Sequence, residues 1–474
     1  MLIANCWVSA KCLMLTKDKS AEIFERLKKF STADEVEALI AGGQSALTRF
    51  ANNTIHQNVA EENYVVSVRT VFGGRTARAT TNKFDDESLK QAVLASEALA
   101  KVQEPDPDLL PLPGPEACEG AAQVGRAFYE TSSLTPGQRA QAVEKIVNVA
   151  KKQKLTAAGI FSNSESVEAV LNSRGLAAYH TQTSSEISVT MLGGDSSGWQ
   201  KFNSPDVRNL NPVALAETAA RKAVQSAKPR ELAAGKYTVI LEPAAVLDLV
   251  GFMFWDFAGM AILDQRSFLN NRVGTQVFGA NITVWDDVSH PLQSGAPFDG
   301  EGVCRQRVQL VEKGVVKRLV YARSTAKKMR ESEYAAKVGP VEPTGHGFPL
   351  PNEIGEAPIN IVFEGPGQAQ SKGVDQMIAG TERGVLVTRL WYIREVDPYE
   401  KILTGMTRDG TFYIEDGQLK NGIRNFRFNE SLLHMLSNVE EMGTPVRASG
   451  EESFDMVVPA MKVREFNFTE VTKF

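Results

Sequence analysis

Residues 70–74 read TVFGG and residues 190–194 read TMLGG, and the sequence around these two stretches has the same organisation. Each glycine pair follows an apolar run that is typical of a strand, and helical periodicity follows each pair. Upstream, Asn52-Asn53 in the first copy corresponds to Asn172-Ser173 in the second copy, with nearly the same spacing. The pattern predicts a duplicated, strand-rich unit that is followed by a helix.

A proline-rich stretch separates the two copies. Prolines recur throughout residues 104–116, where they remove backbone donors and favour an extended conformation. We therefore expect an N-terminal α+β domain over residues 16–230, with an internal duplication into residues 16–103 and 117–230. A shift toward valine-rich runs and glycine turns then predicts a largely antiparallel β C-terminal domain over residues 231–474.

Periodicity and local start signals place the helices and turns. At Thr135-Pro136-Gly137-Gln138, a threonine cap, a proline at the first helical position and a glutamine at the third predict a helix start. The other expected helices cover residues 20–30, 86–102, 212–227, 243–263, 371–379 and 430–438. Turns are expected at Lys313-Gly314, Asp409-Gly410, Asp416-Gly417 and Asn421-Gly422. The whole chain is thus predicted to be an α+β protein.

The composition excludes several classes of protein. With 43% hydrophobic and 23% charged residues over 474 positions, the chain is expected to be globular and multi-domain. A formal net charge of -5 offers no broad attraction to phosphate backbones, so nucleic acid is not expected as a direct partner. The longest apolar stretch, residues 244–263, contains Asp248 and Asp256 and fits a buried helix better than a membrane span. No membrane association is expected.

The cysteines and the first residues bear on compartment. The cysteines lack any CxxC spacing, which disfavours a disulfide framework and favours a reducing compartment; they are Cys6, Cys12, Cys118 and Cys304. Residues 1–13 lack a basic region and a cleavage site, so they are not expected to be a signal peptide. Residues 1–15 are expected to form a disordered leader, and the true start could be Met1 or Met14.

The motifs that could carry chemistry are weak. Residues 194–198 (GDSSG) fit the G-x-S-x-G pattern around Ser196, but a polar, proline-interrupted segment follows in place of a helix, which favours a simple turn. No complete phosphate-binding glycine motif is present. The histidines are solitary in sequence, which disfavours a local metal site; they are His56, His180, His290, His346 and His434.

Several stretches together resemble the TldD/PmbA family, whose members are related to zinc metallopeptidases and carry the label of modulators of DNA gyrase. The resemblance covers nearly the whole chain and includes the helix predicted over residues 243–263. The other stretches are residues 48–53 with Gln57, residues 297–303 (PFDGEGV), 324–328 (STAKK), 344–346 (TGH), 384–388 (GVLVT) and 405–417. They are most similar to the PmbA branch, which is also called TldE.

The resemblance implies where a zinc site should lie. The catalytic TldD branch carries an H-E-x-x-x-H motif on the corresponding helix and a cysteine near the C-terminus. Here the helix window, residues 247–256, contains no histidine, and residues 449–459 contain no cysteine. The resemblance therefore implies a degenerate site without catalytic or metal-binding residues in this chain, in the region of Asp248, Phe252, Met253, Asp256 and Ser453.

The resemblance also implies a function. It predicts a PmbA/TldE-like, non-catalytic subunit of a cytoplasmic TldD/TldE-type zinc metallopeptidase complex that degrades or trims unfolded or modified peptides, with zinc in a TldD-like partner. A homodimer or a heterodimer is expected. The alternatives are a partner-independent, homodimeric peptide-binding adaptor and an independent hydrolase with an unrecognised site. The candidate substrate-binding residues lie in the resembling loops; they are Phe298, Asp299, Glu301, Gly345 and His346.

Overall fold

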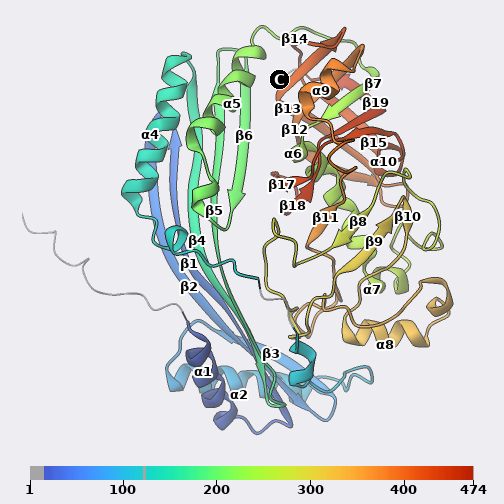
Figure 1. Ribbon diagram of the computed structural model, residues 1–474. Helices are drawn as coiled ribbons and strands as arrows, with labels where there is room; N and C mark the ends of the chain where they lie inside the picture. Colours follow the sequence, from blue (N-terminus) through green and yellow to red (C-terminus); the bar gives the residue numbers. More distant parts are fainter. Residues whose placement is uncertain (1–14, 121–123, 473–474) are drawn as a thin grey trace, which may run out of the picture.

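The computed structural model describes residues 15–120 and 124–472, and its N-terminal part contains one order of elements twice (Figure 1). The first set is α1 (Lys17–Phe30), β1 (Glu35–Ala51), β2 (Thr54–Phe72), β3 (Arg75–Thr81) and α2 (Asp86–Val102). The second set is α4 (Pro136–Lys152), β4 (Thr156–Asn172), β5 (Ala177–Leu192), β6 (Ser197–Ser204) and α5 (Pro212–Gln225). Short helices lie between the sets, at η1 (Pro115–Cys118) and α3 (Tyr129–Ser132), and η2 (Val207–Asn209) precedes α5.

The two sets share one antiparallel sheet with the strand order β3-β2-β1-β4-β5-β6. The long strands β1 and β4 pair at its centre, where Ala41 lies opposite Glu168. Helices α1 and α2 cover one end of the sheet and helices α4 and α5 the other (Figure 1). Each helix pair buries its own apolar cluster against the sheet, so the sheet has a separate core at each end.

Local sequence signals account for these elements. Asn52 and Asn53 have φ angles of 51° and 59°, and Gly73 and Gly74 have angles of 50° and 80°. These left-handed conformations are what two-residue hairpin connections need, because they match the twist of the flanking strands. At α4, Thr135 and Gln138 form the predicted capping box, which is confirmed.

Two sheets make up the C-terminal part. In the first, β12 (Arg383–Asp397), β7 (Gly235–Leu241), β19 (Met461–Val471), β15 (Phe426–Ser431) and β13 (Ile402–Glu415) pair in that order, and β13 also pairs with β12, so the ring closes. Strand β14 (Gln418–Gly422) adds to β13, and β16 (Val439–Met442) adds to β19. The second sheet has the order β10 (Val315–Val316), β9 (Val308–Glu312), β8 (Val284–Asp286), β11 (Ile361–Phe363), β18 (Met456–Val458), β17 (Val446–Ala448).

The pairings in these sheets are antiparallel except β7 with β12 and β11 with β18. The predicted α+β class with a largely antiparallel C-terminal part is therefore confirmed. The remaining helices are α6 (Pro243–Val250), η3 (Gly251–Phe257), α7 (Gly259–Leu263), α8 (Arg323–Glu331), η4 (Ala335–Lys337), α9 (Val374–Ala379) and α10 (Leu432–Ser437). Helix α6 packs between the two sheets, against β7 and β12 on one side and β17 and β18 on the other.

The prediction of one continuous helix over residues 243–263 is wrong. The α-helix ends at Val250, a 3-10 helix follows, and Ala258 is extended before α7 begins. Tertiary contacts cause the break, because Val320 donates its N–H to the carbonyl of Phe257 and accepts one from Gly259. The backbone around Ala258 is therefore hydrogen-bonded to a neighbouring segment and does not continue the helix.

Other local predictions need smaller corrections. Asp409-Gly410 does not form a turn but a bulge inside β13, where the two residues oppose Thr388. Asn421-Gly422 lies at the end of β14, whereas Asp416-Gly417 does form the predicted turn, with φ angles of 51° and 71°. Of the predicted leader, only Leu15 lies within the described residues, and its side chain is buried.

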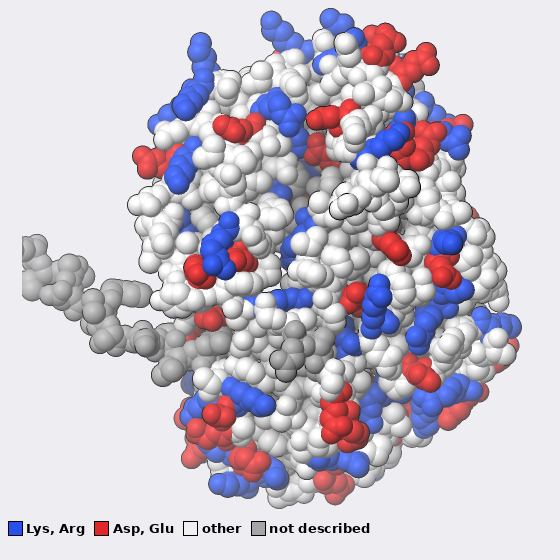
Figure 2. All heavy atoms as spheres, viewed as in Figure 1, with Lys and Arg blue, Asp and Glu red and all other residues white. Residues whose placement is uncertain are grey.

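Several basic side chains join the N-terminal and C-terminal parts, among them Arg126, Arg447 and Lys201. Arg126 donates to the carbonyls of Gly295, Val288 and His290. Arg447 contacts Asn203, and Lys201 Nζ donates to the carbonyl of Gly450 at 2.9 Å. In the face shown in Figure 2, basic and acidic side chains are interspersed. In the part of the chain that the structure describes, we find no helix with the length and apolarity that a membrane span requires.

Candidate functional site

The resemblance implies a degenerate zinc site in two stretches of this chain. These stretches meet where helix α6 contacts the C-terminal loop before β18. Oδ1 of Asp248 accepts hydrogen bonds from the N–H groups of Glu451 (3.1 Å) and Glu452 (3.0 Å). One turn later, Gly251 packs so closely on Ser453 that a Cβ atom at position 251 would lie 1.8 Å from the serine Oγ. The helix window at residues 247–256 and the C-terminal stretch at residues 449–459 are therefore neighbours in space.

An open cleft of about 660 Å³ lies at this junction. Phe252, Trp255, Asp256 and Ser453 line it, and its rim includes Glu451 and Glu452 of the same C-terminal loop and Glu395 of β12. Trp255 is 46% exposed, and its ring stacks on Phe348 with the ring centroids 6.0 Å apart. The cleft thus combines an aromatic wall with several carboxylates.

A lysine lies between two carboxylates of this cleft. Nζ of Lys401 is 2.6 Å from Oδ2 of Asp256 and 2.7 Å from Oε1 of Glu395. Burial raises the pKa of Asp256, although the neighbouring Lys401 opposes that effect. Because both Lys401 and Asp256 are buried, their opposite charges compensate each other away from water. The site holds a fixed ammonium group where carboxylates would otherwise be open to a cation.

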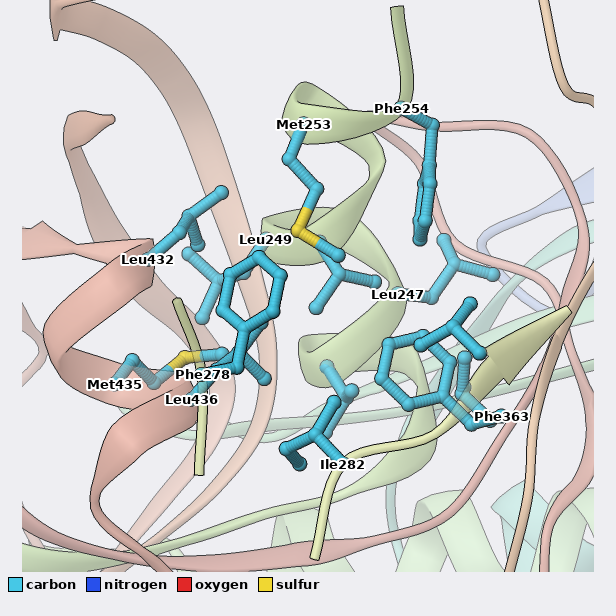
Figure 3. Close-up of a cluster of buried hydrophobic side chains, with 14 of the residues drawn as sticks. Leu247, Leu249, Met253, Phe254, Phe278, Ile282, Phe363, Leu432, Met435 and Leu436 are labelled. Atoms are coloured by element: carbon cyan, nitrogen blue, oxygen red, sulfur yellow. The ribbon is translucent and has the colours of Figure 1, made fainter. Parts of the chain in front are cut away.

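The other residues of the predicted degenerate region face the interior. Met253 of η3 lies in the same buried apolar cluster as Leu432 and Met435 of α10, and the ring of Phe254 packs against Phe363 with the ring centroids 6.4 Å apart (Figure 3). Met253 and Asp248 are completely buried. Burial raises the pKa of Asp248 to about 7, against the two backbone hydrogen bonds on Oδ1. Phe252, Asp256 and Ser453 therefore line the cleft, whereas Met253 and Asp248 lie beneath its surface.

These residues do not fit a zinc ion of the peptidase type. Such an ion needs several imidazole, thiolate or carboxylate ligands that are free to converge on it. In the cleft, Asp256 is paired with Lys401, and Oδ1 of Asp248 is occupied by backbone donors. Within residues 15–120 and 124–472, no group of three or more His, Cys, Asp or Glu side chains is placed to hold a metal. We therefore derive no metal-dependent step for this chain.

The predicted substrate-binding residues lie together at the junction of the N-terminal sheet and the C-terminal part. Asp299 organises the loop that carries them. Its Oδ1 accepts from the N–H groups of Glu301 and Val303, both at 2.9 Å, and its Oδ2 accepts from Gly347 N–H at 2.7 Å. Burial raises the pKa of Asp299 against these hydrogen bonds. The carboxylate of Asp299 therefore fixes the conformation of this loop through its hydrogen bonds to the backbone.

Glu301 and Gly345 support the same loop. Oε1 of Glu301 accepts the N–H of Arg323 at the start of α8, and burial, followed by the nearby Asp299, raises the pKa of Glu301 to about 7. Gly345 has a φ of 71°, and a Cβ there would lie 2.1 Å from the carbonyl oxygen of Cys304. Only glycine fits that position without backbone movement.

His346 is held in a buried chain of polar groups. Its Nε2 lies 3.0 Å from Oδ1 of Asp286, and its Nδ1 lies 3.0 Å from Oγ1 of Thr344. The Asp–His–Thr order is the one that an activated nucleophile would need. However, Thr344 is completely buried, and its hydroxyl also bonds the backbone of Tyr321. The geometry therefore indicates a structural role for this chain of groups.

A second cavity, of about 320 Å³, brings three of the predicted residues to one surface: Phe298, Asp299 and His346. Glu301 and Gly345 are not among its lining residues, and substrate binding by the five stays a prediction. The cavity also exposes two residues that sequence reasoning missed, Glu168 of β4 and Arg305. Neither belongs to a motif, and only the tertiary arrangement brings them together.

Ser196 does not lie in the strand-to-helix turn of a hydrolase. It belongs to the connection between β5 and β6, where the carbonyl of Ser196 accepts the N–H of Gly193 at 2.8 Å. The chain continues as strand β6, so the predicted absence of a following helix is confirmed. The G-x-S-x-G pattern therefore describes a turn within the repeated unit.

Family models match three consecutive parts of the chain. The model described as the PmbA/TldA metallopeptidase C-terminal domain matches residues 234–470. Domain 1 of the same metallopeptidases matches residues 36–100, and their central domain matches residues 126–227. The first of these models alone spans half of the chain.

Individual relatives agree with these matches at low identity. The chain is 22% identical to a metalloprotease PmbA homolog of Haemophilus influenzae, over 79% of each chain. It is 20% identical to the metalloprotease PmbA of Escherichia coli O157:H7, over 78% of this chain and 81% of the relative.

Solved structures show the same fold. TldE from Thermococcus kodakarensis superimposes with a TM-score of 0.82 and 21% identity, covering 95% of this chain and all of that one. A Thermotoga maritima protein described as a modulator of a DNA gyrase gives a TM-score of 0.81 and 19% identity, with the same coverage of both chains.

Proposed function

This chain belongs to the PmbA/TldD metallopeptidase family, and from that membership we propose that it is a TldE-like, non-catalytic subunit of a cytoplasmic TldD/TldE-type zinc peptidase. In this proposal a TldD-like subunit supplies the zinc ion and the chemistry. The present chain contributes an interface and part of the chamber that receives unfolded or modified peptides, and the active form is a heterodimer.

The observation that carries the proposal is the ammonium group of Lys401 between Asp256 and Glu395. A lysine held between two carboxylates repels a divalent cation and occupies the place where the cation would bind them. The same cleft keeps an exposed Trp255 and the polar rim of a binding surface. This combination supports a subunit that has a cleft for a chain but no machinery for hydrolysis. The relatives' descriptions as metalloprotease PmbA and TldE support the same assignment.

Reconstitution with the cognate TldD-like protein tests this function. The chain, its partner and the co-expressed pair are each purified and assayed for cleavage of an unfolded reporter peptide, with zinc content measured by mass spectrometry. We expect zinc in the partner and in the pair but not in this chain alone, and cleavage that rises when both subunits are present. Failure of the two proteins to form a complex, with no gain in cleavage, would contradict the proposal and favour a partner-independent adaptor.

Two matched variants distinguish the proposed subunit from an independent hydrolase. Ser196→Ala in this chain should leave the cleavage by the pair unchanged, because Ser196 lies in a turn between strands. Substitution of the motif glutamate in the TldD-like partner should abolish it, because that residue can remove a proton from zinc-bound water. If Ser196→Ala instead abolished an activity of the isolated chain, the protein would be an independent hydrolase.

A further inference from the structure

The second cavity, of about 320 Å³, lies between the centre of the N-terminal sheet and the C-terminal part. One wall is the paired middle of β1 and β4. The other wall consists of loops from the C-terminal part. Its lining includes residues 39–42 and 166–170 of the strands, residues 298–300 and 346–349 of the loops, and Arg305, Ala357 and Ile359. The cavity is thus bounded by segments that only the folded chain brings together.

Arg305 lines this cavity with a guanidinium group whose Nη1 is buried and makes no hydrogen bond among the described residues. The carboxylates of Asp286 and Asp299 are near enough to feel the charge of Arg305, but neither accepts a hydrogen bond from it, since Asp286 lies against His346 and Asp299 accepts three backbone N–H groups. A buried N–H group without an acceptor is costly, since its desolvation is not offset by a hydrogen bond. The position favours an incoming anion.

Glu168 supplies the opposite charge in the same cavity. Its side chain is exposed to the cavity, and no hydrogen bond or ion pair to it is found within the described residues. Neighbouring atoms crowd it, and this burial raises its pKa against the effect of Arg305. His180 lies directly opposite on β5, but burial lowers its pKa to about 4, so it is neutral at pH 7. The carboxylate of Glu168 is therefore open to a cationic group.

We propose that this cavity binds a compact zwitterion, a free amino acid or a dipeptide, with its carboxylate on Arg305 and its ammonium group toward Glu168. A guanidinium group binds a carboxylate with two parallel hydrogen bonds, which fixes orientation as well as charge. Phe298, Phe348 and Ile359 offer apolar contact to an aliphatic side chain. A zwitterion offers an acceptor to Arg305 and a donor to Glu168 at the same time, which neither a simple anion nor a metal cation does.

This site is separate from the cleft at Lys401. The stacked pair Trp255 and Phe348 lies between them, since Trp255 lines the cleft and Phe348 lines the cavity. The binding belongs to this chain alone and goes beyond the subunit function proposed above. It can therefore be measured without a partner, and its failure leaves the reconstitution experiment unaffected.

Calorimetric titration of the full chain with matched ligands tests the proposal. The probes are L-leucine and L-leucyl-L-alanine, with leucinamide lacking the carboxylate and N-acetyl-L-leucine lacking the ammonium group. We expect saturable binding of at least one zwitterion, and binding weaker by about tenfold or more for each blocked analogue, because each loses one charge-assisted contact. No binding of either zwitterion, or equal binding of the blocked analogues, would overturn the proposal.

Variants assign the binding to the two charged residues. Arg305→Gln and Glu168→Gln should each weaken binding of the zwitterion by about tenfold or more. Arg307→Gln and Glu61→Gln are the controls; Arg307 lies two residues along the same segment with its side chain 59% exposed, and Glu61 is exposed on β2. Equal loss in the controls would reject the assignment. If Arg305→Gln does not fold, Arg305→Lys and the ligand series on the unaltered chain decide the question.

Discussion

Lys401 and Asp248 are buried in the same region, but they differ in how their charge is compensated. Lys401 has Asp256 and Glu395 within hydrogen-bond distance. Asp248 has two backbone donors on Oδ1, whereas its Oδ2 is buried without a hydrogen-bond partner in the described chain. The first residue therefore forms a compensated group, and the second changes its charge near neutral pH because burial raises its pKa to about 7.

Asp248 should make the stability of the protein depend on pH. Because its pKa is higher in the folded than in the unfolded chain, its contribution is fully present below about pH 4 and is lost as the pH rises through about 7. Asp248→Asn keeps an acceptor for the two N–H groups and cannot ionise. We expect the free energy of unfolding of the unaltered chain, relative to the variant, to fall by roughly 2–4 kcal/mol from pH 4 to pH 8. Urea unfolding at several pH values measures this, and parallel profiles would contradict it.

Lys401→Met should be strongly destabilising, because it leaves Asp256 buried without its cation. Removal of one partner of a buried ion pair typically costs about 3–5 kcal/mol. We expect a loss of roughly 2–4 kcal/mol, since Glu395 is partly solvated. The double variant Lys401→Met/Asp256→Asn should recover much of it. Urea unfolding of these two variants and of Asp256→Asn gives the coupling energy, with exposed Lys420→Met as a control, and strictly additive losses would show that the pair is not coupled.

The elements that could be predicted from sequence are those with local causes. The capping box at Thr135 and the turns at Asn52-Asn53 and Gly73-Gly74 follow from residue types within a few positions. The break at Ala258 could not be predicted, because the apolar periodicity continues through it and its cause is a pair of hydrogen bonds to Val320. The residue types of Asp409-Gly410 predict a turn because they accept left-handed backbone conformations. A bulge needs the same conformations, so residue type alone does not distinguish the two.

The contact of η3 with the C-terminal loop should depend on the missing side chain at Gly251. In Gly251→Ala the new Cβ would lie 1.8 Å from Oγ and 2.5 Å from Cβ of Ser453, so the two segments must separate. We expect a loss of roughly 1–3 kcal/mol, the usual cost of overpacking. Thermal and urea unfolding measure this loss.

A second substitution tests whether that contact is the cause. Ser453→Gly in the Gly251→Ala background removes both clashing atoms and should restore part of the lost stability. Gly137→Ala is the matched control, because a Cβ at that helical position meets nothing within 4 Å, and it should be neutral or slightly stabilising. Equal stability of Gly251→Ala and the control would show that the segments adjust freely.

The candidate sites include residues whose role could not be predicted from the sequence. The resemblance pointed to the helix and the C-terminal loop, and these do meet at Asp248 and Ser453. It gave no indication of Lys401, which comes from the connection between β12 and β13, or of the charged residues Glu168 and Arg305. Those residues acquire their meaning from the neighbours that the fold gives them: Lys401 lies between Asp256 and Glu395, and Glu168 and Arg305 line one cavity. Their arrangement depends on how distant segments of the chain pack together.

That packing should depend on Arg126, which is 6% exposed and donates to three carbonyls of the C-terminal part. Burial, followed by the nearby Arg447, lowers its pKa to about 10, so it remains charged at pH 7. Arg126→Met leaves those carbonyls without their donor and should cost roughly 2–4 kcal/mol. Arg208→Met is the control, since Arg208 is 59% exposed in the same part of the chain.

Differential scanning calorimetry distinguishes a local from a global effect of this change. If Arg126 holds the two parts together, the variant should show an earlier or divided transition, because the N-terminal sheet separates before the C-terminal core unfolds. A transition that coincides with that of Arg208→Met would show that the remaining contacts, such as those of Lys201, Arg447 and Arg78, suffice. In the divided case the cavity between Glu168 and Arg305 opens with the first transition, so a zwitterion bound there should raise the midpoint of that transition and leave the second unchanged.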